Sequence, residues 1–388
     1  MKRSHAATCV ALAAALLAAA TLTAKGDEAG VSEDAILFGQ AAALEGPSSM
    51  LGQHMRHGIV AAFTEINAKG GVHGRKLQLV SRDDGYDPDR SVVQTLRLIE
   101  DDKVFALIGA VGTATAMATI PITSTRDVPF IGPVSGAELL RDLELTNVVN
   151  IRPSYGAESE TLIKHLIEDR HFTRIGIFYQ DDSFGHDGLA GVKTALAKRG
   201  LELAAEGTFE RNTRAVGAAW RTIKRAEPEA IIMVGTYGPS AEFIKLAHRS
   251  GAYPTFASIS FVGATALARE LGSDGEGVVV AQVVPFPWDR SIKLVADYQS
   301  AQKAIDPTLT PDFVSLEGYL SGRLAAAALE NLGPNPTRAG LLRTINDIGR
   351  FDISGTVFTV GFRAIETPPK VFLTVIQKDG TFRAIDRL

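Results

Sequence analysis

Short apolar runs alternate with amphipathic helical segments along most of this 388-residue chain, and this alternation limits the folds open to it. Helical patterns separate consecutive runs, as they do where helices cover both faces of a parallel sheet. We therefore predict an α/β protein with two doubly wound, Rossmann-like lobes. The runs of the first series are 36–42, 76–80, 104–109 and 130–131, and those of the second are 175–179, 230–234, 255–258 and 278–284.

The pattern changes after residue 284. The segment 285–288, Pro-Phe-Pro-Trp, is stiff and would suit a passage of the chain between lobes. Helical patterns at 292–303, 313–332 and 338–345 follow, and two short strand patterns at 356–360 and 370–377 end the chain. We interpret these elements as additions that complete the two lobes, not as a third domain.

The N-terminus has the features of a secretory signal peptide. Lys2 and Arg3 precede an almost purely Ala and Leu run at 10–20, and small residues follow up to position 24. A membrane anchor or a buried helix is the alternative, but the run is too short to span a bilayer comfortably. We expect residues 1–24 to be removed and the protein to be periplasmic. Cys9 precedes the apolar run, so it does not fit a lipoprotein.

Charge and cysteine content exclude several kinds of partner. The chain has 40 basic and 44 acidic residues and a net charge of −4, so nothing favours a nucleic acid. Removing the signal peptide would make that charge about −6. A single cysteine excludes an intramolecular disulfide and a cysteine-rich metal site.

No familiar catalytic motif is present. The sequence lacks a phosphate-binding loop, a dinucleotide-binding glycine turn, a zinc-protease helix and a hydrolase nucleophile elbow. No nucleophile stands beside a convincing base, and His54 and His57 are best read as exposed helix residues. We predict that the protein is not an enzyme and has no cofactor or metal.

Two junctions between strands and following segments could bind an anion. Residues 107–109 end a strand, and Thr113 follows where a helix begins, so free N–H groups and a hydroxyl would meet there. Thr113 could equally be a helix cap. At 132–136, Pro133 has no N–H, which leaves the Val134 carbonyl and the Gly136 amide as polar contacts.

Several ordered segments resemble one known family. Residues 67–77 read Asn-Ala-Lys-Gly-Gly-Val-His-Gly-Arg-Lys-Leu; the turn at 46–47 with Gly52, the stretch 84–88 and Ile108-Gly109 occur in matching order. The set resembles the periplasmic leucine/isoleucine/valine-binding proteins, the type I solute-binding proteins of branched-chain amino acid ABC transporters. The resemblance covers about 36–377.

This resemblance implies a monomeric receptor with two lobes that close on a small ligand around three hinge crossovers. The crossovers would fall near 152–153, 284–285 and 364–368. The N-terminal lobe would then be 35–152 plus 285–364, and the C-terminal lobe 153–284 plus 365–388. The expected partners are an amino acid or related carboxylate and an inner-membrane ABC permease.

The resemblance also implies a ligand site between the lobes. Thr113, with Ser135 beside it, and the Gly136 amide would hold a carboxylate, and the Val134 carbonyl would accept from an ammonium group. Leu51 would line the cleft. Two positions match ligand-facing tyrosines of the second lobe: these are Phe184, which lacks the hydroxyl, and Tyr237, which keeps it.

Ser260 departs from the family pattern, in which a glutamate at this point balances the ligand ammonium. Either another acid replaces it, with Glu45 and Glu317 as candidates, or the ligand has no ammonium. Glu317 could instead stabilise the hinge, and Tyr155 could face the cleft. The alternatives are therefore a receptor for aromatic carboxylates without an amine and a sensory receptor on the same fold.

Overall fold

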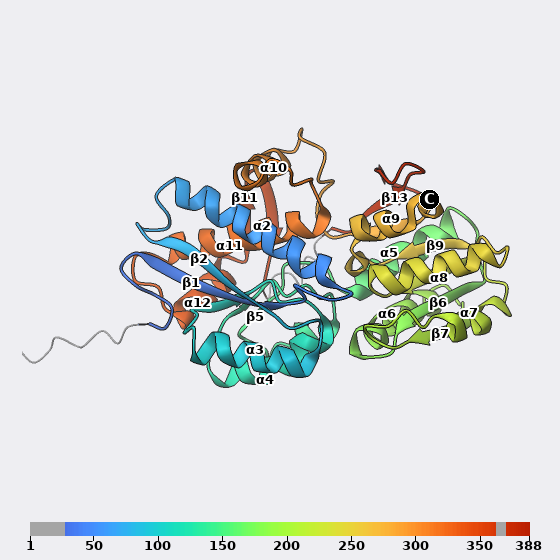
Figure 1. The fold of residues 1–388 in the computed structure, drawn as a ribbon, viewed down its shortest axis with the longest axis horizontal. Coiled ribbons are helices and arrows are strands. Elements are labelled where there is room, and N and C mark those ends of the chain that lie inside the picture. The colour runs from blue at the N-terminus through green and yellow to red at the C-terminus, as the bar shows by residue number, and fades with distance from the viewer. Residues whose placement is uncertain (1–27, 362–369) are drawn as a thin grey trace, which may run out of the picture.

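The computed structural model describes residues 28–361 and 370–388, which form two α/β lobes lying side by side (Figure 1). The first lobe contains a parallel five-stranded sheet in the order β2-β1-β3-β4-β5. Its order reverses direction at β1, as doubly wound sheets do. The strands are β1 (Ala35–Ala42), β2 (Lys76–Asp83), β3 (Ala106–Ile108), β4 (Phe130–Ile131) and β5 (Val148–Val149).

The second lobe contains a seven-stranded sheet in the order β14-β13-β10-β9-β8-β6-β7. Strands β6 to β10 are parallel, whereas β13 and β14 extend the edge in antiparallel fashion. The α/β prediction with two doubly wound lobes is confirmed. The strands are β6 (Ile175–Gln180), β7 (Ala205–Phe209), β8 (Ala230–Val234), β9 (Thr255–Ser258), β10 (Val279–Gln282), β13 (Phe372–Ile376) and β14 (Phe382–Ile385).

Helices surround both sheets (Figure 1). Those of the first lobe are α2 (Ser49–Ala68), α3 (Pro88–Glu100), α4 (Thr113–Thr125), α10 (Lys293–Ile305), α11 (Phe313–Leu332) and α12 (Arg338–Ile348), with the short 3-10 helix η1 (Glu138–Arg141). Those of the second lobe are α5 (Tyr155–Glu168), α6 (Ser183–Ala197), α7 (Gly217–Lys224), α8 (Tyr237–Arg249) and α9 (Ala264–Leu271), with η2 (Ser260–Val262) and η3 (Gly272–Gly275).

Local capping explains where the helices near the lobe interface begin. Ser154 caps α5 by accepting a hydrogen bond from the Ala157 amide at 3.2 Å. The apolar pattern of the sequence predicts a helix over 158–169, so the observed helix begins three residues earlier, and Tyr155 and Glu158 share its first turns. Likewise, Asp182 caps α6 by accepting from the Phe184 amide at 3.0 Å.

Helices α2 and α11 approach closely at two glycines. A Cβ atom on Gly58 would lie 1.9 Å from the Ser315 carbonyl oxygen, and one on Gly318 would lie 2.2 Å from the Met55 carbonyl oxygen. Only glycine allows this approach, which places α2 firmly against the C-terminal part of the first lobe.

The chain passes from the first sheet to the second between β5 and α5, at Arg152 and Pro153, and returns to the first lobe between β10 and α10. The third predicted crossover, at 364–368, and the predicted signal peptide, 1–24, lie outside the described residues.

Two features of the sheets differ from the expectation. The prediction of a terminal strand at 356–360 corresponds to β12 (Thr356–Thr359), which pairs with β11 (Arg350–Ile353) in a separate hairpin and joins neither main sheet. Strands β7 and β14 were not predicted. Both lie on edges of the second sheet and include polar residues, and β7 also contains Gly207, so they lack the continuous apolar pattern of its buried strands.

Candidate functional site

The N-terminus of α4 lies near Tyr155 of the second lobe and has no side-chain cap. Strand β3 ends at Ile108, and Gly112 with φ 110° then stands at the N-cap position. Because glycine has no side chain, the first N–H groups of the helix are left to other partners. The Thr113 hydroxyl lies 2.7 Å from the Ser135 hydroxyl, so its partner is a second site residue and not its own helix.

The segment around Ser135 runs beside this helix end. Val134 pairs with Val111, and its carbonyl accepts from the Gly112 amide at 3.2 Å. The Val134 carbonyl was predicted to accept from a ligand ammonium group. Its hydrogen bond from Gly112 already uses one of the two lone pairs of that oxygen. The Ser135 hydroxyl also accepts from the Ala137 amide at 3.2 Å. Within the part of the chain that the structure describes, the Gly136 N–H has no hydrogen-bond acceptor of good geometry.

Tyr155 extends from the second lobe to this polar group. Its backbone amide donates to the Gly136 carbonyl at 2.7 Å, and its ring lies against the Cα of Gly136. Its hydroxyl is buried and makes no hydrogen bond of good geometry with a described residue, although the Thr113 and Ser135 hydroxyls are its polar neighbours. Burial raises the pKa of Tyr155 to about 12, so the hydroxyl is a neutral donor.

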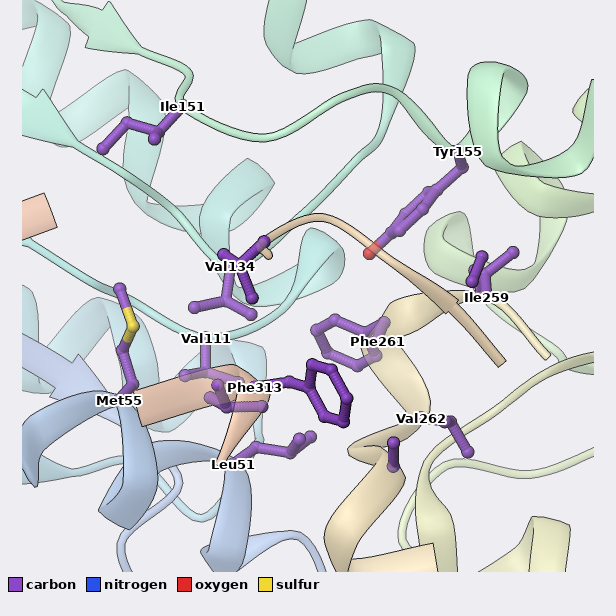
Figure 2. Packing of buried hydrophobic residues seen from close by; sticks show 14 of the residues in the cluster. Leu51, Met55, Val111, Val134, Ile151, Tyr155, Ile259, Phe261, Val262 and Phe313 are labelled. Atoms are coloured by element: carbon purple, nitrogen blue, oxygen red, sulfur yellow. The ribbon is translucent and has the colours of Figure 1, made fainter. Parts of the chain in front are cut away.

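Aromatic and aliphatic side chains from both lobes enclose this polar group. The ring of Phe184 lies 5.3 Å from that of Tyr155 and 4.6 Å from that of Phe261. On the opposite side, Leu51 of α2 packs against Gly263 of the second lobe. Figure 2 shows Leu51 and Val134 facing Phe261 and Tyr155, with the Tyr155 hydroxyl directed toward the first lobe. All of these residues are buried.

Tyr237 connects the two lobes beside Leu51. It is the first residue of α8, and its hydroxyl accepts a hydrogen bond from the Met50 amide of α2 at 3.4 Å. Burial raises the pKa of the Tyr237 hydroxyl, while the Met50 amide and the Ser49 side chain oppose this rise. The residue is therefore a direct contact between the lobes.

Ser260 binds an acid that the sequence did not identify. Its amide donates to one carboxylate oxygen of Glu158 at 2.6 Å, and its hydroxyl donates to the other at 3.0 Å. Glu158 comes from α5 and is fully buried. The only sequence signal for this residue was its position in the first turn of a helix, just after Tyr155. Because the helix was predicted to start at Glu158 itself, the sequence did not indicate that the two residues share a turn.

The two acids proposed as replacements for the missing glutamate do not lie beside Ser260. Glu317 forms a buried bidentate ion pair with Arg152, at 2.8 and 2.7 Å. This pair supports the hinge interpretation, because Arg152 belongs to the first crossover. Glu45 is exposed at the loop before α2, where its amide donates to Asp83.

The sequence analysis did not identify three further residues at this interface: Tyr86, Gln180 and Phe261. Tyr86 of the first lobe is buried against Phe261, with ring centroids 6.0 Å apart, and its hydroxyl accepts from the Gln180 amide group at 3.2 Å. Tyr86 has φ 60°, which is uncommon for a residue with a side chain. No spacing in the sequence joins these positions, since Tyr86 and Gln180 are 94 residues apart.

Among residues 28–361 and 370–388, no group of three or more His, Cys, Asp or Glu side chains could hold a metal ion. No helix in those same ranges is long and apolar enough to cross a membrane.

Comparison with known proteins gives consistent matches. Residues 35–370 match the model of a family described as periplasmic binding protein. A Leu/Ile/Val-binding protein homolog 7 from Brucella abortus (strain 2308) is 26% identical over 281 residues, which cover 70% of this chain and 68% of that protein.

Solved structures match over nearly the whole fold. A possible leucine/isoleucine/valine-binding protein from Rhodopirellula baltica SH 1 has a TM-score of 0.85 and 36% identity, covering 91% of this chain and 96% of that chain. A fatty acid ABC transporter substrate-binding protein from Thermomonospora curvata has a TM-score of 0.83 at 21% identity, covering 93% of each chain. At that identity the second match shows the fold alone.

Proposed function

Because the chain belongs to the periplasmic binding protein family, whose members here are binding proteins and not enzymes, we propose that it is the solute receptor of an ABC importer. Its ligand would be an amino acid or a related small carboxylate held between the lobes. The names of the relatives support this class: one is called a Leu/Ile/Val-binding protein homolog and another a possible leucine/isoleucine/valine-binding protein.

One arrangement carries the proposal: the uncapped N-terminus of α4 together with hydrogen-bond donors from both lobes. The Thr113 hydroxyl and the Gly136 amide come from the first lobe, and the unpaired hydroxyl of Tyr155 comes from the second. Such donors suit a carboxylate, since the Gly136 amide and the Tyr155 hydroxyl would otherwise stay buried without an acceptor, and the Thr113 hydroxyl can donate to a ligand while it accepts from Ser135. A ligand bound by both lobes would favour the closed arrangement over an open one.

The remaining predicted site residues would shape the space around the ligand. Leu51, Phe184 and Tyr237 would contact its body, as the resemblance implies, and the packing of Leu51 on Gly263 supports this placement. Ser135 would hold Thr113 in position through their hydroxyl contact. The Val134 carbonyl would accept only weakly, since the Gly112 amide already binds it.

We also propose the lobe boundaries and the location that this function requires. The lobes would be 35–152 plus 285–364 and 153–284 plus 365–388, with hinges at the three crossovers. The mature protein would act as a monomer in the periplasm and deliver its ligand to an inner-membrane permease. The Arg152–Glu317 pair supports the first hinge, because it fixes the crossover to α11.

A ligand screen on stripped protein tests the proposal. The protein is unfolded, dialysed and refolded to remove any bound solute. Its melting temperature is then measured with the standard amino acids, with aliphatic and aromatic monocarboxylates, and with amines that lack a carboxyl group. A ligand at one hundred times its Kd stabilises by about 2.7 kcal/mol, which is easily detected. The proposal fails if no carboxylate raises the melting temperature.

A further inference from the structure

Asp187 joins the two lobes through a carboxylate that is only half satisfied. It lies on α6 of the second lobe, and its Oδ1 accepts a hydrogen bond at 3.0 Å from the Glu138 amide of η1 in the first lobe. Its Oδ2 is buried and has no hydrogen-bond partner among the described residues. A buried carboxylate oxygen without a donor is unfavourable when it is charged, because it has lost its water. The contact between the lobes therefore disfavours the ionised form of Asp187.

The charged groups on η1 do not neutralise this carboxylate. Arg141 faces it, but the Arg141 guanidinium donates to the carbonyls of Ala137 and Arg152, at 2.9 and 2.7 Å. Glu138 adds a second negative charge on the same short helix. Burial raises the pKa of Asp187 to about 6, and repulsion by Glu138 adds to the rise, while the Glu138 amide and Arg141 oppose it.

The other elements packed against this part of α6 supply no cation either. Helix α4 has no titratable residue between Thr113 and Thr125, and on α6 itself His186 contacts Asp181 at 3.1 Å. The titratable residues of α5 are neutral, bound elsewhere or exposed: these are Tyr155, Glu158 with Ser260, Glu160 and Glu168 with Arg199, His165 with Asp169, and exposed Lys164.

Separating the lobes would change the surroundings of Asp187. The Glu138 amide would leave and water would reach both oxygens, so the pKa would return toward its ordinary value of 3.8. Because the closed arrangement has the higher pKa, it favours the protonated carboxyl. The resulting contribution to closure is complete below about pH 4 and is lost as the pH rises through 6.

We propose that Asp187 makes closure of the two lobes acid-sensitive, because the closed arrangement binds a proton at this carboxyl and opening releases it. The protonated group still offers an oxygen to the Glu138 amide, and it no longer places a charge on the buried Oδ2. This inference rests on the opening and closing motion of the proposed function, but it does not depend on which ligand is bound.

The test follows closure and protonation separately in ligand-free protein. Small-angle X-ray scattering between pH 5 and 7.5 measures the ratio of closed to open molecules, and NMR of carbon-13-labelled aspartate measures the pKa of Asp187. With pKa values of about 6 closed and 3.8 open, we expect the ratio to rise about tenfold as the pH falls from 7.5 to 5. In Asp187→Asn the ratio should not depend on pH, since the amide does not titrate and can still accept from Glu138. The carboxyl signal that this variant loses should titrate near pH 6 in the wild type.

Asp84→Asn is the matched control. Asp84 is also buried with a pKa of about 6, but it accepts only from Tyr86 and Ser91 of its own lobe, so this variant should keep the wild-type dependence. A constant ratio in the wild type, or an Asp187 carboxyl that titrates below about pH 4.5, would overturn the proposal. So would a dependence that survives in Asp187→Asn, which would belong to another group such as His54 beside Asp312. None of these results touches carboxylate binding, and a failed ligand screen would leave the scattering result in place.

Discussion

The guanidinium of Arg152 is held by both carboxylate oxygens of Glu317, at 2.8 and 2.7 Å, and both side chains are buried. The two residues are 165 positions apart and join the first crossover to α11. The third nitrogen of the guanidinium, Nη1, has no described partner, so the pair is the main polar restraint on Arg152. The Glu317 carboxylate therefore neutralises the buried charge of Arg152 where the two lobes meet.

Removing this carboxylate should destabilise the protein strongly. We expect Glu317→Gln to lower the free energy of unfolding by about 3–5 kcal/mol, because it leaves a buried arginine without a counterion. Glu100→Gln, which affects an exposed pair with Arg126, should cost less than about 1 kcal/mol. Urea unfolding followed by circular dichroism measures both. Equal effects of the two variants would mean that water reaches Arg152.

Replacing the Thr113 hydroxyl should weaken carboxylate binding without harming the fold. Thr113→Val keeps the shape of the side chain but removes a donor to a charged group, which costs about 1.5–3 kcal/mol, or roughly ten- to a hundred-fold in affinity. Thr125→Val, at the other end of α4, removes an exposed hydroxyl that binds only its own helix and should leave affinity unchanged. Calorimetry with the ligand found by screening measures both affinities. Unchanged affinity in Thr113→Val would contradict the proposed carboxylate site at Thr113.

The sequence allowed the sheets to be predicted better than the site. Buried strands such as β6 and β8 are almost continuously apolar, so their pattern is easily identified, whereas three of the five residues of β7 are partly exposed at an edge. Helix starts were harder to predict, since Ser154 and Asp182 cap their helices through hydrogen bonds to one or two amides, which periodicity does not reveal.

Site residues could be predicted only where one short segment carries the chemistry. The junction at Thr113 can be recognised in the sequence, because glycines precede Thr113 and a helical pattern follows it. The link between Glu158 and Ser260 spans 102 residues and depends on how α5 packs, so no local pattern contains it. For the same reason the sequence pointed to Glu45 and Glu317, which are acids of suitable type in unsuitable places.

The contact of Tyr237 with α2 should help to hold the lobes closed. Tyr237→Phe removes the oxygen that accepts from the Met50 amide, a hydrogen bond worth about 0.5–1.5 kcal/mol. We expect ligand dissociation to accelerate by about three- to tenfold, with little change in the association rate. Stopped-flow fluorescence measures both rates. Tyr253→Phe alters an exposed tyrosine and serves as the control; a slower association in Tyr237→Phe with unchanged dissociation would argue against this role.

The stability of the first lobe should fall as the pH rises through 6. Burial raises the pKa of Asp84 to about 6, despite hydrogen bonds from Tyr86 and Ser91. Since the folded pKa exceeds the unfolded one, folding favours the protonated form: this stabilisation is complete below about pH 4 and is lost above pH 6.

Asp84→Asn tests this dependence. The amide stays neutral and can still accept from the Tyr86 amide, so we expect the variant to lose less stability than the wild type between pH 5 and 7.5, by about 1.4 kcal/mol. Asp89→Asn, an exposed change in the first turn of α3, should follow the wild-type curve. Melting temperatures across this range provide the comparison, and parallel curves for all three proteins would show that Asp84 is ionised without cost.

The close approach of α2 and α11 predicts a steric effect of a single methyl group. In Gly318→Ala the new Cβ would lie 2.2 Å from the Met55 carbonyl oxygen, so the helices must separate. Crowding of this kind costs about 1–3 kcal/mol, which exceeds the gain of up to about 1 kcal/mol from higher helix propensity. In Gly217→Ala, at the start of α7, the new methyl meets only the end of the Arg221 side chain at 3.6 Å, so this control should be neutral or stabilising. Calorimetric melting should place Gly318→Ala below the wild type and Gly217→Ala at or above it, because only the first change forces two backbones apart.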